Sequence, residues 1–72
     1  MSVSKKRNLK KLGMRIKKMR LARNISGNQL AFEIGTSEKY LRQLEKGELN
    51  FGVNKLYQLA EVLDIDIKEF FD

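Results

Sequence analysis

The chain has 72 residues, with 15 Lys and Arg against 9 Asp and Glu, and it contains no His, Cys or Pro. Zinc fingers, iron-sulfur proteins, thiol enzymes and Ser-His-Asp hydrolases need His or Cys as ligand, base or nucleophile, so these classes are excluded. A single domain of this size buries only about 60% of the surface of its unfolded chain, which leaves little room for a catalytic pocket beside the core. We therefore expect a binding module, not an enzyme, with no metal and no cofactor.

The balance of apolar and charged residues predicts a folded, soluble protein. Apolar residues make up 42% of the chain and charged residues 33%, which provides enough hydrophobic side chains for a core. No uncharged run approaches the roughly 20 residues of a membrane span, and the N-terminus lacks the apolar stretch of a secretory signal. We expect a cytoplasmic protein that does not enter a membrane.

The positive charge is concentrated at the N-terminal end. Residues 1–23 carry ten basic side chains and no acidic one, whereas residues 24–50 have a net charge of −1 and residues 51–72 a net charge of −3. Such a stretch suits a nucleic acid or an anionic membrane surface, and a solvated helix face has the same pattern. Its polar face lacks the aromatic anchors of a membrane-surface helix, which weakens the membrane interpretation.

The N-terminal third predicts an arm and a helix. Residues 1–8 have no apolar period and are expected to form a flexible basic arm, which either enters a DNA groove or acts as a solubilising tail. Apolar residues then recur at intervals of three and four, which predicts an amphipathic helix over residues 9–23. These residues are Leu9, Leu12, Ile16 and Met19.

Two short helices joined by a tight turn follow. Ser26 and Gln29 have the spacing of a capping box, and Gly35 is placed to end the helix that begins there. Ser37 offers a second N-cap, and Gly47 closes the next apolar stripe. Two short helices joined by a turn of about three residues that contains Gly are the local signature of a helix-turn-helix.

The C-terminal third predicts a loop over residues 48–52, a fourth helix over residues 53–63 and a short final helix over residues 67–71. The sequence thus predicts an all-α domain of five helices over residues 9–72. Its expected core consists of Leu12, Ile16, Met19, Ile25, Leu30, Ala31, Ile34, Leu41, Leu44, Leu56, Leu59, Ala60 and Leu63.

Three segments resemble the phage repressor and Cro-like helix-turn-helix family, often called the XRE family. They are RIKKMRLARNIS, QLAFEIGTSEKYLRQLEKGELN and LYQLAEVLDIDIKEFF, and the resemblance covers about residues 12–71 without a gap. It implies a compact repressor-like fold whose helices 2 and 3 form the helix-turn-helix, with double-stranded DNA as the partner. The helix from Ser37 to Lys46 would then lie in the major groove, its N-terminal turns against base edges.

The resemblance also implies which side chains read bases. Gln43 can pair with an adenine edge, Lys39 or Arg42 can donate to guanine, and Glu38 can accept from a cytosine amino group. The alternative is that these four residues are only the exposed polar side of a helix.

Phosphate contacts are implied for groups around this helix. They are Gly27, Asn28, Tyr40, Lys46, Asn50 and the backbone amides near Val53. Two residues depart from the family pattern. Gly27 stands where glutamine is common, and Glu48 places a negative charge in a loop that is often basic.

Two further sets complete the sequence expectations. Arg20 and Glu45 occupy positions that resemble an ion pair linking the first helix to the end of the recognition helix. Large apolar residues near the C-terminus exceed what a small core can hide, so we expect a twofold dimer interface there. The alternative is a monomer whose aromatic side chains complete its own core. The interface set is Phe51, Tyr57, Val62, Ile65, Phe70 and Phe71.

Together these features predict a DNA-binding transcriptional regulator that binds a palindromic operator as a homodimer. An alternative keeps the DNA-binding fold but makes binding of a partner toxin the main role, as in an antitoxin. An enzyme would rest only on scattered carboxylates. RNA binding by the basic arm would lack an aromatic platform for stacking single strands.

Overall fold

The computed structural model describes residues 6–71 and shows four α-helices followed by one 3₁₀-helix. The helices are α1 (Lys6–Ala22), α2 (Gly27–Glu33), α3 (Glu38–Glu45), α4 (Val53–Leu63) and the 3₁₀-helix η1 (Ile67–Phe71). The expected all-helical architecture is confirmed for this part of the chain. The expectation of five α-helices is wrong, because the last segment is a 3₁₀-helix.

Local hydrogen bonds explain the 3₁₀ form of the final segment. Asp64 ends α4 in a left-handed conformation with φ 55°. The backbone amide of Lys68 then donates to the Asp66 carboxylate at 3.1 Å, and the amide of Glu69 donates to the Asp66 carbonyl at 2.9 Å. These tight turns occupy a segment of only five residues, a length typical of a 3₁₀-helix.

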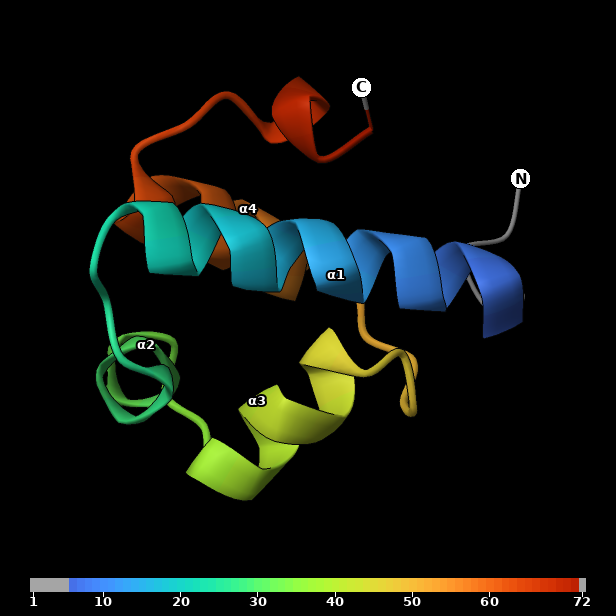
Figure 1. Cartoon of the computed structure of the whole chain (residues 1–72), viewed down its shortest axis with the longest axis horizontal. Helices are drawn as coiled ribbons and strands as arrows, with labels where there is room; N and C mark the ends of the chain where they lie inside the picture. The colour runs from blue at the N-terminus through green and yellow to red at the C-terminus, as the bar shows by residue number, and fades with distance from the viewer. Residues whose placement is uncertain (1–5, 72) are drawn as a thin grey trace.

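Helix α1 lies across the middle of the molecule, with α3 on one side, η1 on the other and α4 behind it (Figure 1). It begins at Lys6, three residues before the expected start, because Lys and Arg favour helix even without an apolar period. Residues 1–5 of the expected arm lie outside the described residues.

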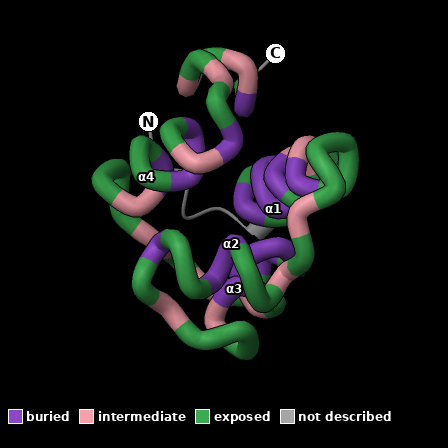
Figure 2. Tube along the Cα trace, turned by 90° about the vertical axis from the view of Figure 1, so that its left-hand side faces the viewer, coloured by how far each residue is buried: buried purple, intermediate pink, exposed green. Residues whose placement is uncertain are grey.

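The core lies where the inner faces of the helices meet, as the buried segments in Figure 2 show. Every residue of the expected core lies in or against it, with Met19 and Ile25 only partly buried. Leu9 is also buried, and Phe70 from η1 joins the core with 1% of its surface exposed. Phe70 was expected at a dimer interface, but its side chain is enclosed within one chain and is not available to a second.

Two glycines bring the backbones of α1 and the end of α3 into contact. A Cβ atom on Gly13 would lie 2.5 Å from the carbonyl oxygens of Leu44 and Glu45. Gly47 follows α3 with φ 72°, and a Cβ atom there would lie 2.5 Å from Cα of Lys10. Since real Cβ atoms do not approach so closely, only glycine fits at either position, and the two helices are held at a fixed separation.

Candidate nucleic-acid interface

The helix-turn-helix is formed by α2, a turn and α3. Gly35 adopts φ 71° in the turn, and the amide of Thr36 donates to the carbonyl of Ala31 at 2.8 Å. The Ser37 hydroxyl then accepts the amide of Tyr40 at 3.0 Å, which caps the start of α3. The turn and the caps thereby fix the direction of α3 relative to α2, as the sequence signature predicts.

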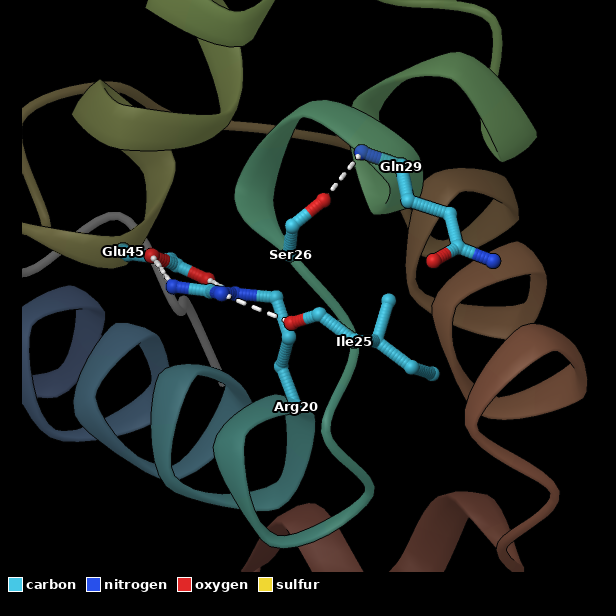
Figure 3. A network of polar contacts seen from close by, with 5 residues as sticks. All are labelled: Arg20, Ile25, Ser26, Gln29 and Glu45. Carbon is cyan, nitrogen blue, oxygen red and sulfur yellow. Dashed lines mark hydrogen bonds and ion pairs between the residues drawn. The ribbon is translucent and has the colours of Figure 1, made fainter.

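The start of α2 is capped in the same way, but the expected capping box is only half formed. Ser26 accepts the amide of Gln29 at 3.0 Å. The Gln29 carboxamide points away from Ser26 (Figure 3), so the reciprocal bond of the box is missing. The carboxamide is instead exposed at the start of α2.

The four residues expected to read bases share one face of α3. Glu38, Lys39 and Arg42 are exposed and Gln43 is partly exposed; at 3.6 residues per turn they span an arc of about 140°. Leu41 and Leu44 are buried on the opposite side, and buried Glu45 lies at the border of this face, between Leu41 and Glu38 around the helix. This face therefore presents two cations, one carboxylate and one carboxamide to the solvent, a set that matches the donors and acceptors on base edges.

The residues expected to contact phosphates differ in their exposure. Asn28, Lys46, Asn50 and Val53 are exposed, whereas Gly27 and Tyr40 are partly buried. Gly52 precedes α4 without a side-chain cap bond. The first amides of α4, beginning at Val53, therefore have no partner within the helix and can donate to an anion.

An ion pair fixes α3 against α1. The Arg20 Nε and Nη2 atoms donate to the two carboxylate oxygens of Glu45 at 2.8 and 3.1 Å, and Nη1 donates to the Ile25 carbonyl at 2.9 Å (Figure 3). Arg20 and Glu45 are each 8% exposed. The structure thus contains the ion pair expected from the sequence, and this pair links the end of α1 to the end of α3.

The expected interface residues fall into two groups once Phe70 is removed. Tyr57 and Phe71 are 58% and 55% exposed, respectively. Phe51, Val62 and Ile65 are partly buried against the core. A shallow groove of about 430 Å³ lies beside α4, and two of the expected interface residues, Tyr57 and Ile65, line it. Its lining consists of Tyr57, Gln58, Ala60, Glu61, Ile65, Asp66 and Ile67.

Sequence reasoning missed a second groove, of about 460 Å³, which we call the α1–α3 groove. It is lined by Lys10, Met14, Lys17, Arg42, Glu45, Lys46, Gly47 and Glu48. The signal in the sequence was the spacing of Lys10, Met14 and Lys17 along one side of α1. That spacing indicates a groove only once the packing of α1 against α3 is known, because α3 forms the other side of the groove.

Metal-binding clusters and membrane-spanning helices are absent from residues 6–71. The cysteine-free and histidine-free chain has no group of three or more metal-binding side chains within that range. No helix of the described part of the chain is long and apolar enough to cross a membrane.

The chain is similar in sequence to a helix-turn-helix family and to two bacterial regulators. The model of the helix-turn-helix family HTH_3 matches residues 16–70. An uncharacterised HTH-type transcriptional regulator of Rickettsia prowazekii is 36% identical over 61 residues, which cover 85% of this chain and 47% of that protein. A similar regulator of Rickettsia conorii is also 36% identical, with 49% of its length covered. The chain therefore spans about half the length of these relatives.

Solved structures show the same fold. The restriction-modification controller protein C.AhdI of Aeromonas hydrophila aligns with a TM-score of 0.86 and 34% identity, covering 90% of this chain and 98% of that chain. The clp gene regulator ClgR of Corynebacterium glutamicum aligns with a TM-score of 0.84 and 21% identity, covering 86% and 66%. Both relatives and both structures carry the names of regulators or controllers, and none is named as an enzyme.

Proposed function

This chain belongs to the helix-turn-helix family that its residues 16–70 match, and we propose that it is a transcriptional regulator that binds double-stranded DNA at specific sequences. The observation that carries the proposal is the exposed polar face of α3, formed by Glu38, Lys39, Arg42 and Gln43. Because the Arg20–Glu45 pair and the α2–α3 turn hold this helix from behind, the face is presented as a rigid surface.

The dimensions of α3 suit the major groove. An α-helix with its side chains is about 10–12 Å in diameter, which matches the width of the groove, about 12 Å. In this arrangement Gln43 and Arg42 contact base edges, while Lys46 and the first amides of α4 contact phosphates and set the register without reading sequence.

Competition between DNA duplexes tests the proposal. A labelled duplex from the promoter region that the protein controls is displaced by the same unlabelled duplex or by a scrambled one of equal length and composition, at one fixed salt concentration. We expect the matching duplex to compete on the order of a thousandfold better or more. Equal competition by the two duplexes would refute sequence-specific binding.

We further propose that two copies bind a palindromic operator. The chain extends only 29 × 24 × 19 Å, whereas successive turns of the major groove lie about 34 Å apart, so one copy reaches one half-site. Helix α4 packs against α1 and η1 and lies behind α1 in Figure 1, whereas α2 and α3 lie on another side of α1. Exposed Tyr57 of α4 and Phe71 of η1 provide apolar surface for a twofold contact.

Sedimentation of the protein, free and bound to operator, measures this stoichiometry. Two chains per operator are expected, and Tyr57→Lys should shift the free protein towards monomer because a charge would be buried in the contact. One chain per operator would overturn the dimer. Copurification of a tightly bound second protein, masking the same surface, would instead support the antitoxin alternative.

The similarity to C.AhdI supports a narrower proposal about the regulated genes. Because that controller of a restriction-modification system aligns over 98% of its chain with 34% identity, we propose that this protein also regulates restriction-modification genes. Mapping its binding sites on genomic DNA tests this proposal. Sites upstream of a restriction endonuclease or DNA methyltransferase gene are expected, and sites only at unrelated promoters would refute it.

A further inference from the structure

The α1–α3 groove is lined by cationic side chains. Lys10 and Lys17 of α1 meet Arg42 and Lys46 of α3 around the exposed side chain of Met14. Two carboxylates also line this groove. The carboxylate of Glu45 is buried and already paired with Arg20 at 2.8 Å, which leaves Glu48 as the exposed acidic group of the lining. The lining therefore has an excess of positive charge.

The backbones on the two sides of the groove also come close together. Gly13 lies one turn from Lys10 and Lys17 on α1, and its backbone contacts the carbonyl oxygens at the end of α3. Gly47 makes the matching contact with the backbone of Lys10. These two close approaches bring the backbone of α1 that carries Lys10 near the end of α3, so the cations of both helices lie around one groove.

The position of the groove indicates its ligand. It lies at the C-terminal end of α3, beside Arg42 and Lys46. When the first turns of α3 contact base edges, its C-terminal end lies farther from the bases and nearer the phosphate backbone. Lys10, Lys17 and Lys46 at that edge complement a chain of phosphodiesters.

We propose that the α1–α3 groove binds the phosphate backbone of the same DNA duplex outside the base-contacted segment, through Lys10 and Lys17. This inference rests on the proposed DNA-binding function and extends the DNA contact from the helix-turn-helix to the first helix. The lysines on the next positions of α1, Lys11 and Lys18, lie in a different groove, away from α3. They provide a matched control on the same helix.

The experiment compares Lys10→Gln/Lys17→Gln with Lys11→Gln/Lys18→Gln. Each double variant removes two lysines seven residues apart from exposed positions of α1, so net charge and helix composition stay equal. Affinity for an operator duplex with long flanks is measured at several salt concentrations. Circular dichroism confirms that both variants remain folded.

The groove variant should lose two phosphate contacts, which reduces the slope of log affinity against log salt by about 1.8. If phosphate contacts contribute no affinity near 1 M salt, a slope lower by about 1.8 means that the groove variant binds about 60-fold more weakly than the wild type at 0.1 M salt. The control variant should keep the slope of the wild type and lose less than about threefold in affinity, since distant charges are screened over about 10 Å at 0.1 M salt. Trimming the flanks of the duplex should bring the wild type and the groove variant to equal affinity.

Equal slopes and equal affinities for the two double variants would overturn the inference, because the lysines would then act only through the general positive field of α1. The inference would also be overturned if the groove variant still bound the trimmed duplex more weakly than the wild type. Failure of the proposed function gives a different result, since the wild type itself would then show no preference between matching and scrambled DNA.

Discussion

Replacement of Glu45 by alanine tests how strongly the buried ion pair holds α3 in place. The substitution removes the two carboxylate oxygens that accept hydrogen bonds from Arg20 at 2.8 and 3.1 Å. The guanidinium then keeps only its hydrogen bond to the carbonyl of Ile25, at 2.9 Å. Arg20 is only 8% exposed, so water cannot readily replace the lost carboxylate. Removing one partner of a buried pair costs about 3–5 kcal/mol, because the other charge is left uncompensated.

This loss is large relative to the stability of a domain of 72 residues. At 0.05–0.15 kcal/mol per residue, the free energy of unfolding is about 4–11 kcal/mol. One kcal/mol shifts the melting temperature of a domain this small by about 4–8 °C, so Glu45→Ala should lower it by at least about 12 °C.

Urea denaturation followed by far-ultraviolet circular dichroism measures the change, since the chain is helical and has no Trp. The matched control is Arg20→Met/Glu45→Leu, which removes both charges and should be more stable than Glu45→Ala. A loss below about 1 kcal/mol for Glu45→Ala would refute the argument, as would a double variant less stable than the single one.

Four other substitutions probe the fold and the site separately. Gly13→Ala places a Cβ atom 2.5 Å from two carbonyl oxygens of α3, so the unfolding free energy should fall by about 1–3 kcal/mol. An unchanged urea midpoint would contradict the close approach of α1 and α3 at this glycine. Ser37→Ala removes the cap bond to Tyr40 and should cost about 1 kcal/mol in the same assay. Gln43→Ala should relax the preference at one base position of each half-site, by about 1–3 kcal/mol of discrimination in a competition series. Lys46→Ala should instead weaken binding to all duplexes alike and reduce the salt slope by about 0.9; a sequence-dependent loss would contradict its assignment to phosphate.

The boundaries of the two motif helices were predictable because their signals are local. Ser26 and Ser37 each accept the amide three residues later, at 3.0 Å, and Gly35 adopts the left-handed conformation of a turn. Each of these features depends on a few neighbouring residues. The sequence therefore predicted the helix-turn-helix without knowledge of the tertiary structure.

Features that depend on helix crossings were not predictable in this way. Nothing near Gly13 in the sequence shows that its Cα faces the carbonyls of Leu44 and Glu45. Phe70 and Phe71 are adjacent and chemically identical, yet the first is 1% exposed and the second 55%. The 3₁₀ geometry of η1 decides which of them enters the core. The α1–α3 groove was missed for the same reason, since its two sides are more than twenty residues apart in the chain.

The most direct test of the central claim is selection of bound sequences from random DNA duplexes by the wild-type protein, followed by mass measurement of the enriched complex. Sequence-specific binding by α3 predicts one enriched motif made of two inverted half-sites, with centres about 10 base pairs apart or a multiple of a helical turn, and two protein chains per duplex. Recovery of duplexes without any shared motif would contradict the claim that α3 reads bases.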